Sequence, residues 1–273
     1  MTTTRAILAV SFLGMALGFS ETPKPLKVML ITGGCCHDYK AQTGILKKGL
    51  EERANIAVTE VHVDDGSTKP PLPIYGVPDY AKGYDLVIHD ECAAGVSDLE
   101  TIKGVLKPHE KDGIPGVVLH CAMHSYRQTG FDKKVENFDE PRSMWFEFIG
   151  LQSTGHGQQL PIDVTFTDEA KTNPITKGMK DWTTGKEELY NNISVFDTLK
   201  PLAKGKQGNT ETVVVWTNLY KGKTRVFGTT LGHNNETVSD SGYLDMVTKG
   251  ALWAMDKLDE TGHPKAGYGR VTK

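Results

Sequence analysis

Blocks of hydrophobic and polar positions alternate along the first half of this chain and predict strands and helices in turn. Four short apolar runs predict strands at Lys27–Thr32, Ile56–Val63, Tyr84–His89 and Gly116–Leu119. Two segments with apolar residues on one side predict helices at about 41–53 and 97–111, the second with Ser97 as its hydroxyl N-cap. The predicted order is β-α-β-β-α-β, and crossover helices of this kind imply that the strands pair in parallel. The pattern therefore predicts an α/β fold.

The second half of the chain is less regular. We predict a short helix at Ser143–Ile149 closed by Gly150, a strand at Pro161–Phe166, an antiparallel hairpin of Thr212–Trp216 with Thr224–Leu231, and a last helix at Tyr243–Leu258. The segments Arg127–Arg142 and Gln152–Gly157 lack either periodicity and predict loops. The first of these loops is expected to lie over the carboxyl edge of the sheet.

The N-terminal twenty residues differ from the rest of the chain. Arg5 precedes the apolar run Ala6–Phe19, and Ala16-Leu17-Gly18 supplies small residues at a cleavage-like spacing. This pattern predicts a secretory signal peptide over 1–20, followed by a domain over 25–260 and a flexible tail over 261–273. The apolar run is shorter than the roughly 20 residues of a membrane span. We therefore expect a secreted or periplasmic protein with no stable membrane insertion after signal removal.

Composition and charge narrow the class of partner. The chain of 273 residues is 38% hydrophobic and 24% charged, which is typical of one globular domain with a sizeable core. Its formal charge is -3, and loss of Arg5 with the signal peptide leaves about -4. A weakly acidic chain gives no reason to expect nucleic acid as a partner. A homo-oligomer is left open.

Four cysteines raise the question of disulfides in an exported protein. Cys35 and Cys36 are adjacent, while Cys92 and Cys121 each follow a predicted strand. The sequence does not pair them, and the simplest interpretation is that most are small buried hydrophobes. The absence of a CxxC spacing makes a metal-thiolate cluster an unfavoured interpretation.

Polar side chains follow several predicted strands at the point where each strand ends. His120 follows the buried strand Gly116–Leu119, and His37 and Asp38 follow the first strand. Asp38 also stands where it can cap the next helix. His233 ends the second strand of the hairpin. In an open parallel sheet ligands bind outside the carboxyl ends of the strands, so these groups are expected to converge there.

Two further segments are expected to join this edge. His156 lies between two glycines that permit close backbone approach. In the extended segment Lys186–Tyr190 only one of two adjacent acids can face inward. We expect Glu188, which shares its face with Tyr190, to do so and Glu187 to be solvated.

Imidazoles and a carboxylate support two kinds of chemistry. They can hold a divalent metal such as zinc, for which the predicted ligands are His120, His156 and His233. They can instead act as general acid and base on a sugar, with catalytic roles for His120, His233 and Glu188. The predicted substrate-binding residues are His37, Asp38, Ser125, His156, Tyr190 and Asn234.

Several of these motifs together resemble one known family. They are Thr32-Gly33-Gly34 to His37-Asp38-Tyr39, Leu119 to Ser125, Gly155-His156, Glu187 to Tyr190, Val215-Trp216, Arg225 to Asn234, and Leu252-Trp253-Ala254. In this order they resemble the ThuA-like (trehalose utilisation) family. The resemblance implies a class I glutamine-amidotransferase-like, flavodoxin-like fold. It also implies a role in carbohydrate breakdown, with oxidised (3-keto) glycosides as the substrates.

The chain departs from true amidotransferases at the residues that hydrolyse glutamine. Those enzymes carry a cysteine in a Gly-x-Cys-x-Gly elbow, and these glycines are missing around Cys121. They also carry His-Pro-Glu near the last strand, whereas His233 is followed by two asparagines. Ordinary glutamine hydrolysis is therefore not expected.

The sequence thus favours an exported enzyme that cleaves keto-glycosides by elimination or hydrolysis, with or without a metal. Two alternatives remain at this point. Cys121 could be a nucleophile activated by His233, which would make the protein a cysteine-dependent hydrolase. The polar edge could also bind a sugar without catalysis.

Overall fold

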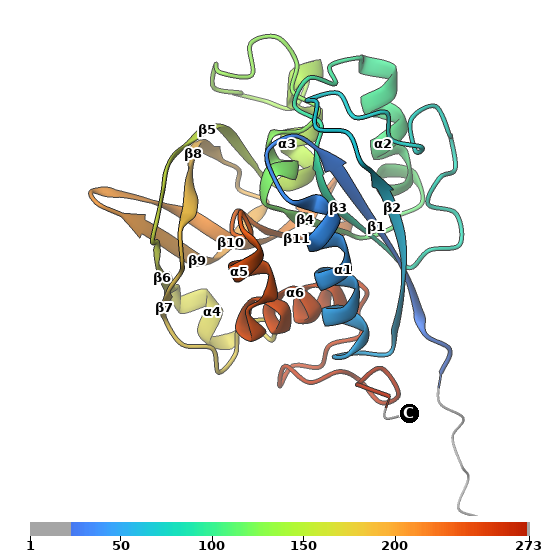
Figure 1. Ribbon diagram of the computed structural model, residues 1–273, viewed down its shortest axis with the longest axis vertical. Helices are drawn as coiled ribbons and strands as arrows, with labels where there is room; N and C mark the ends of the chain where they lie inside the picture. The colour runs from blue at the N-terminus through green and yellow to red at the C-terminus, as the bar shows by residue number, and fades with distance from the viewer. Residues whose placement is uncertain (1–22, 272–273) are drawn as a thin grey trace, which may run out of the picture.

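A computed structural model describes residues 23–271 of the chain (Figure 1). The predicted signal peptide over residues 1–20 lies outside the described residues. Between residues 23 and 271, no helix combines the length and the apolar character needed to cross a membrane.

A large mixed sheet forms the centre of the fold. Within the described residues its nine strands have the order β2-β1-β3-β4-β11-β10-β9-β6-β7. Their bounds are β1 Leu26–Gly34, β2 Ile56–Val63, β3 Leu86–Cys92, β4 Gly116–Leu119, β6 Asp163–Phe166, β7 Trp182–Thr183, β9 Leu199–Gln207, β10 Thr210–Tyr220 and β11 Thr224–Thr229. The first five strands in this order pair in parallel, and the remaining pairs are antiparallel.

The parallel part has the strand order of a flavodoxin-like sheet, with β11 in the place of the fifth strand. The predicted hairpin is present as β10 and β11, which pair antiparallel. The predicted fold class, a mostly parallel sheet with a C-terminal antiparallel hairpin, is therefore confirmed. The strands β5 Leu151–Leu160 and β8 Glu187–Val195 form a separate antiparallel pair.

Helices cover both faces of the sheet, as predicted. They are α1 Tyr39–Glu51, α2 Leu99–Lys111, α3 Met144–Ile149, α4 Asp168–Thr172, α5 Asn235–Ser239 and α6 Ser241–Ala254, with 3-10 helices at His120–His124 and Pro141–Ser143. One hydrophobic core holds Leu46 of α1 and Val247 of α6, and α1, α5 and α6 lie together in Figure 1. A second core holds Leu106 of α2 and Phe148 of α3. The sheet is thus buried on both faces between two layers of helix.

The ends of the helices follow local sequence chemistry. Asp38 is the N-cap of α1 and accepts a hydrogen bond from the Ala41 amide at 3.2 Å, as predicted. The prediction of Ser97 as the cap of α2 is wrong, because Asp98 caps it and accepts from the Thr101 amide at 2.8 Å. An anionic cap one residue later gains from the positive end of the helix dipole. Gly150 ends α3 with a left-handed φ of 93°.

The second half differs from the sequence predictions in several elements, and α4, α5 and β7 were among those not predicted. The segment Gln152–Gly157, predicted as a loop, lies inside β5 and pairs with β8 through several register shifts. Bulges accommodate the glycines that made this segment look like a loop. The strand β9 was not predicted, because its lysines and proline hide the alternation of apolar positions.

The predicted flexible tail contacts the start of β2. The backbone amide of Asn55 donates to the Tyr268 carbonyl at 3.0 Å, and the Asn55 side chain donates to the Gly267 carbonyl at 3.0 Å. These bonds hold the described part of 261–273 against the domain, and its flexibility stays a prediction.

The polar end of β3 forms a buried network rather than an open edge. Nδ1 of His109 lies 2.7 Å from the Ile114 carbonyl, which can only accept, so this nitrogen carries the proton. Its Nε2 therefore accepts from Nε2 of His89 at 3.1 Å. Nδ1 of His89 lies 2.9 Å from the Glu91 carboxylate, which also accepts from the Tyr126 hydroxyl at 2.7 Å. The network joins α2 to β3.

Acid is expected to destabilise the protein through His109. Burial, and next the neighbouring His89, lower its pKa from 6.5 to about 3. The unfolded chain therefore binds a proton below pH 6.5 that the folded chain refuses, so this stabilisation is complete above pH 6.5 and is lost as the pH falls towards 3. When the pH falls from about 7 to about 4.5, both proteins lose free energy of unfolding. We expect this loss to be about 2 kcal/mol smaller in His109→Gln than in the unsubstituted protein.

Urea unfolding at several pH values measures this difference. The exposed His263 supplies the matched control, because His263→Gln should follow the unsubstituted protein at every pH. Equal acid losses in His109→Gln and the unsubstituted protein would contradict the assignment.

Candidate active site

The carboxylate of Glu188 lies among three imidazoles that come from separate parts of the chain. Its oxygens lie 3.6 Å from Nε2 of His120, 3.5 Å from Nε2 of His156 and 3.3 Å from Nδ1 of His233. His120 follows β4, His156 lies on β5, and His233 lies in the segment after β11. The structure thus brings together the predicted catalytic residues His120, His233 and Glu188.

His120 stands on a strained turn between β4 and the 3-10 helix His120–His124. Its φ of 40° lies in the left-handed region that non-glycine residues rarely adopt. Strain of this kind is concentrated at functional sites. Nδ1 of His120 lies 2.6 Å from the Thr230 carbonyl, so it donates the hydrogen bond and fixes the ring.

The other ring nitrogen of His120 lacks a hydrogen-bond partner. Nε2 is buried and unpartnered, and it lies 3.6 Å from the Glu188 carboxylate. A lone pair on this nitrogen would face a negative charge. A proton or a cation at Nε2 relieves this repulsion, so the site is built to hold positive charge at this point.

His37 and His233 complete a group of three histidines. The ring of His37 lies 4.6 Å from that of His120 and 4.8 Å from that of His233. The possible ligand atoms of His37, His120 and His233 all lie within 4.8 Å of one another. Nδ1 of His37 donates to the His233 carbonyl at 3.2 Å, which leaves its Nε2 free.

This compact group differs by one residue from the metal ligands named from the sequence, and that ligand set stays a prediction. His156 is absent from the compact group, and His37 takes its place. His156 contacts Glu188 from β5, where its ring is 41% exposed, and its Nδ1 donates to the Gly157 carbonyl at 2.9 Å. A glycine on either side indicated an accessible histidine, but it could not show on which side of Glu188 the ring would lie.

Burial and neighbouring charges shift the pKa values of the site residues in different directions. Burial would raise the pKa of the Glu188 carboxyl, but contacts with His120 and His233 outweigh it and hold that pKa well below its usual range. Close contact with Glu188 raises the pKa of His233, against the opposing effect of burial. Burial and the nearby charge of His120 lower the pKa of His37 to about 3. His233 is thus the favoured proton carrier, while His37 stays neutral.

Glu187 was expected to be solvated, and that prediction is wrong. The residue is fully buried, and its carboxylate accepts hydrogen bonds from the backbone amides of Gly232 at 3.2 Å and His233 at 3.1 Å. These amides satisfy the charge in place of water. Two adjacent acids on β8 therefore hold the same segment, Glu188 through the side chain of His233 and Glu187 through its backbone.

Aromatic rings form the floor of the site. Tyr190 is buried, and its hydroxyl has no partner. Its ring stacks on His124 at 4.3 Å and lies 5.1 Å from His120. Nε2 of His124 also lies 2.9 Å from the Ser153 hydroxyl. Tyr190 thus fixes the imidazoles from below.

Three predicted substrate-binding residues have structural partners. The Ser125 hydroxyl is fully buried, where it donates to the Glu91 carbonyl and accepts from the Ala93 amide. The Asn234 side chain caps α5 through the Thr237 amide and donates to the Lys186 carbonyl. Asp38 caps α1 and accepts from the Asn235 side chain at 2.8 Å. Of these three, Asp38 and Asn234 line the mouth of the site.

Cys121 lies beneath the histidines and is 6% exposed. Contact with Cys92, followed by burial, raises the pKa of the Cys121 thiol well above its usual range. Because only the thiolate is an effective nucleophile, this environment disfavours attack by Cys121. The geometry therefore gives more support to the imidazoles than to the thiol.

Of the residues that the predictions missed, His124 had a signal in the sequence and the buried Glu187 had none. His124 belongs to the same polar cluster as His120 and follows it at a spacing of four, but no role was assigned to it. Glu187 immediately precedes Glu188, and in strands alternate residues face opposite sides. Glu187 is nevertheless buried, because the segment Gly232–His233 covers its side of β8. The sequence around Glu187 does not reveal that contact.

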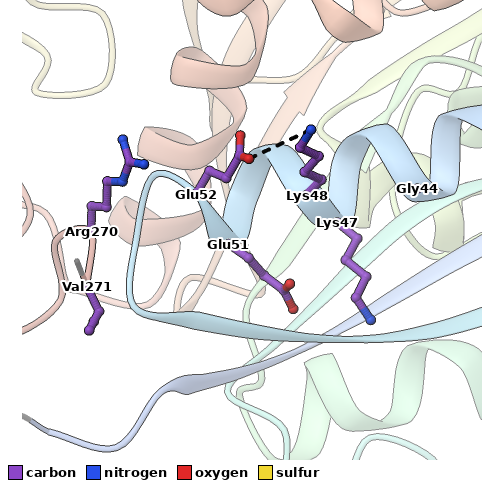
Figure 2. Close-up of a pocket in the computed structure, with 7 residues that line it drawn as sticks. All are labelled: Gly44, Lys47, Lys48, Glu51, Glu52, Arg270 and Val271. Carbon is purple, nitrogen blue, oxygen red and sulfur yellow. Dashed lines mark ion pairs between the residues drawn. The ribbon is translucent and has the colours of Figure 1, made fainter. Parts of the chain in front are cut away.

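A depression at the surface leads to this group. It has a volume of about 450 Å³ and is lined by Cys36, His37, Asp38, His233, Asn234 and Asn235. A second hollow lies between α1 and the C-terminal segment, where Lys48 and Glu52 form an ion pair at 3.9 Å (Figure 2). Its lining contains lysines and glutamates but no histidine or cysteine. The histidine group therefore makes the first depression the candidate active site.

Comparisons with known proteins match most of the chain. A family model described as ThuA, trehalose utilisation, matches residues 27–254. No curated protein matches the chain.

Two solved structures have a similar fold. A ThuA-like protein from Parabacteroides merdae has a TM-score of 0.64 at 20% identity, over 91% of this chain and 98% of that one. A ThuA-like protein from Bacteroides uniformis has a TM-score of 0.57 at 15% identity, over 92% and 99%.

Proposed function

The chain belongs to the ThuA (trehalose utilisation) family, and from this premise we propose that it is a carbohydrate-processing enzyme that cleaves 3-keto-glycosides. One observation carries the proposal. The Glu188 carboxylate lies 3.3 to 3.6 Å from three imidazoles at the carboxyl edge of the sheet. A carboxylate that pairs with several imidazoles can hold and move protons.

The chemistry of a keto-sugar suits such a group. A ketone acidifies the hydrogen on the neighbouring carbon, so a base can remove it without a pair of glycosidase carboxylates. His120 takes this proton on Nε2, and Glu188 stabilises the charge that the ring gains. The glycosidic oxygen then departs, protonated by His233, whose pKa Glu188 raises. Addition of water completes hydrolysis, and release before that step gives elimination.

The histidines also fit a divalent metal such as zinc. His37 and His120 each donate Nδ1–H to a backbone carbonyl, and Nδ1 of His233 faces Glu188. Orientation through one nitrogen is typical of histidines that bind metal through the other. His37, His120 and His233 would hold the ion, and a bound ion polarises the ketone.

Metal binding gives a prediction that separates the two possible ligand sets. As the alternative to proton transfer by His120 and His233, a metal-bound site would contain about one zinc per chain, and His37→Ala and His233→Ala would lose it, because a three-histidine site rarely keeps its metal with two ligands. His156→Ala should retain zinc, since His156 lies outside the compact group. Elemental analysis after dialysis measures the content. Loss from His156→Ala with retention in His37→Ala would reverse the assignment.

Turnover of 3-keto-glucosides by the purified protein tests the function itself. His120→Ala and His233→Ala are each expected to lower kcat by about 10²- to 10⁴-fold, the range for loss of an acid or base. Retained activity in both variants would end this mechanism. Calorimetric binding of the sugar without product, in the unsubstituted protein, would instead favour a sugar-binding protein.

Export is part of the proposal. Residues 1–20 have the pattern of a signal peptide, and Cys35 and Cys36 form a disulfide, a bond typical of oxidising compartments. N-terminal sequencing of the secreted or periplasmic protein locates the cleavage site.

A further inference from the structure

A disulfide and a buried thiol meet at the end of β1, beside the candidate active site. Cys35 and Cys36 are joined by a disulfide, while Cys92 and Cys121 are free and buried. The sulfur of Cys92 lies 3.6 Å from that of Cys35. This is van der Waals contact between a thiol and one sulfur of a disulfide.

The backbone holds these sulfurs together. Gly34, the last residue of β1, pairs with Cys92 at the end of β3. The φ of Gly34 is 103°, and a Cβ there would lie 2.2 Å from the Cys92 carbonyl oxygen. Because Gly34 has no side chain, the turn that carries the disulfide can lie directly on β3. The contact is therefore a consequence of the fold.

The three sulfurs differ in their access to solvent. Cys92 is 2% exposed, Cys35 is half-buried, and Cys36 is exposed. Cys36 also lines the 450 Å³ depression, next to His37. An attack by Cys92 on Cys35 would therefore come from inside the protein and release the sulfur that faces solvent.

We propose that Cys35, Cys36 and Cys92 form a thiol–disulfide exchange site that exposes Cys36 to modification by low-molecular-weight disulfides. The Cys92 thiolate attacks Cys35, so that the Cys35–Cys92 bond forms and the Cys35–Cys36 bond breaks. Cys36 leaves as a thiolate and takes up the proton that Cys92 gave up. The number of disulfides is unchanged, so the step needs no oxidant or reductant.

Cys121 favours this exchange through its effect on Cys92. Its contact with Cys92 is the main influence that lowers the pKa of the Cys92 thiol, against the effect of burial. A thiol with a lowered pKa supplies more of the attacking thiolate. The exchange is independent of the keto-glycoside reaction, because none of its sulfurs has a part in that mechanism.

The three cysteines also lie close enough for a metal, with ligand atoms within 4.8 Å of one another. With Cys35 and Cys36 bonded, however, Cys92 alone among them can supply a thiolate. The oxidised protein therefore favours exchange over metal binding.

Peptide mapping with iodoacetamide tests the exchange in the full chain, purified without reductant. Trypsin places Cys35 and Cys36 in residues 28–40, Cys92 in residues 83–103 and Cys121 in residues 112–127. Alkylation of released Cys36 would trap the exchanged form. We expect Cys36 to acquire the label and peptides 28–40 and 83–103 to become joined by a disulfide. Each labelled chain should contain one such cross-link.

Two variants and one control complete the test. Cys92→Ser should lose both the label and the cross-link, whereas Cys121→Ser should still form them, but more slowly, because Cys121 lowers the pKa of Cys92. Mild reduction of the unsubstituted protein shows that Cys36 can be labelled once it is free. If Cys36 stays unlabelled without reductant, or if it is labelled equally in Cys92→Ser, the proposal is overturned. Should Cys92→Ser fail to fold, the cross-link in the unsubstituted protein still decides the question.

Discussion

Replacement of Glu188 by glutamine is expected to lower kcat on 3-keto-glucosides by about 10⁴-fold, the loss known for a carboxylate that orients and charges a catalytic imidazole. The amide keeps the size of the side chain but removes its negative charge. His120 would then gain its proton without a counter-charge, and His233 would lose the contact that raises its pKa. One substitution thus disables both proton-transfer residues.

The matched control makes the same chemical change at an exposed acid. Glu211 lies on β10 and pairs with Lys204 at 3.0 Å on the surface. Glu211→Gln should leave kcat unchanged, and circular dichroism should show the same fold for both variants. Steady-state kinetics give the comparison. Near-normal turnover by folded Glu188→Gln would show that the carboxylate is not part of the catalytic group.

The second large effect concerns the stability of the turn that carries Cys35 to His37. Gly34→Ala is expected to lower the free energy of unfolding by about 3 kcal/mol or more. Strain at a left-handed φ costs roughly 1–3 kcal/mol, and overpacking adds a similar amount. The new Cβ would lie 2.2 Å from the Cys92 carbonyl oxygen, which is backbone and moves only if β3 moves. The turn or the end of β3 must therefore move to accommodate the new Cβ.

Gly44 provides a control in the next element. It lies in the middle of α1, is exposed, and a Cβ there meets nothing within 4 Å. Gly44→Ala should stabilise the protein by about 0.5–1 kcal/mol, because alanine favours the helix. Urea unfolding measures both variants. A change of less than about 0.5 kcal/mol in Gly34→Ala would contradict the close approach of the turn to β3.

The comparison between sequence and structure is most informative along β8. Alternation in a strand correctly indicated that Glu188 shares an inward face with Tyr190. It also implied that Glu187 faces water, and that prediction was wrong. The amides of Gly232 and His233, 45 residues or more away in the chain, supply the hydrogen bonds that allow this carboxylate to be buried. A pattern read along one strand contains no information about donors on another segment.

The same limit explains the histidines. Because parallel strands end at one edge, the sequence indicated that His37, His120 and His233 would converge. Whether His37 or His156 would join His120 and His233 in the compact group depended on the position of each ring in the folded protein. His156 was taken for a ligand because glycines flank it, yet pairing of β5 with β8 places its ring on Glu188 outside the group.

The sequence by itself predicted where the parallel strands lie along the chain, the helices between them, the hairpin strands and the Asp38 cap, because each depends on neighbours within a few residues. Only the tertiary structure decided that Glu187 is buried, that Ser125 and Asn234 have backbone partners, and that Cys92 touches a disulfide. Those outcomes depend on side chains that meet across the sheet, and the free energy of each contact exists only once its distant partner is in place.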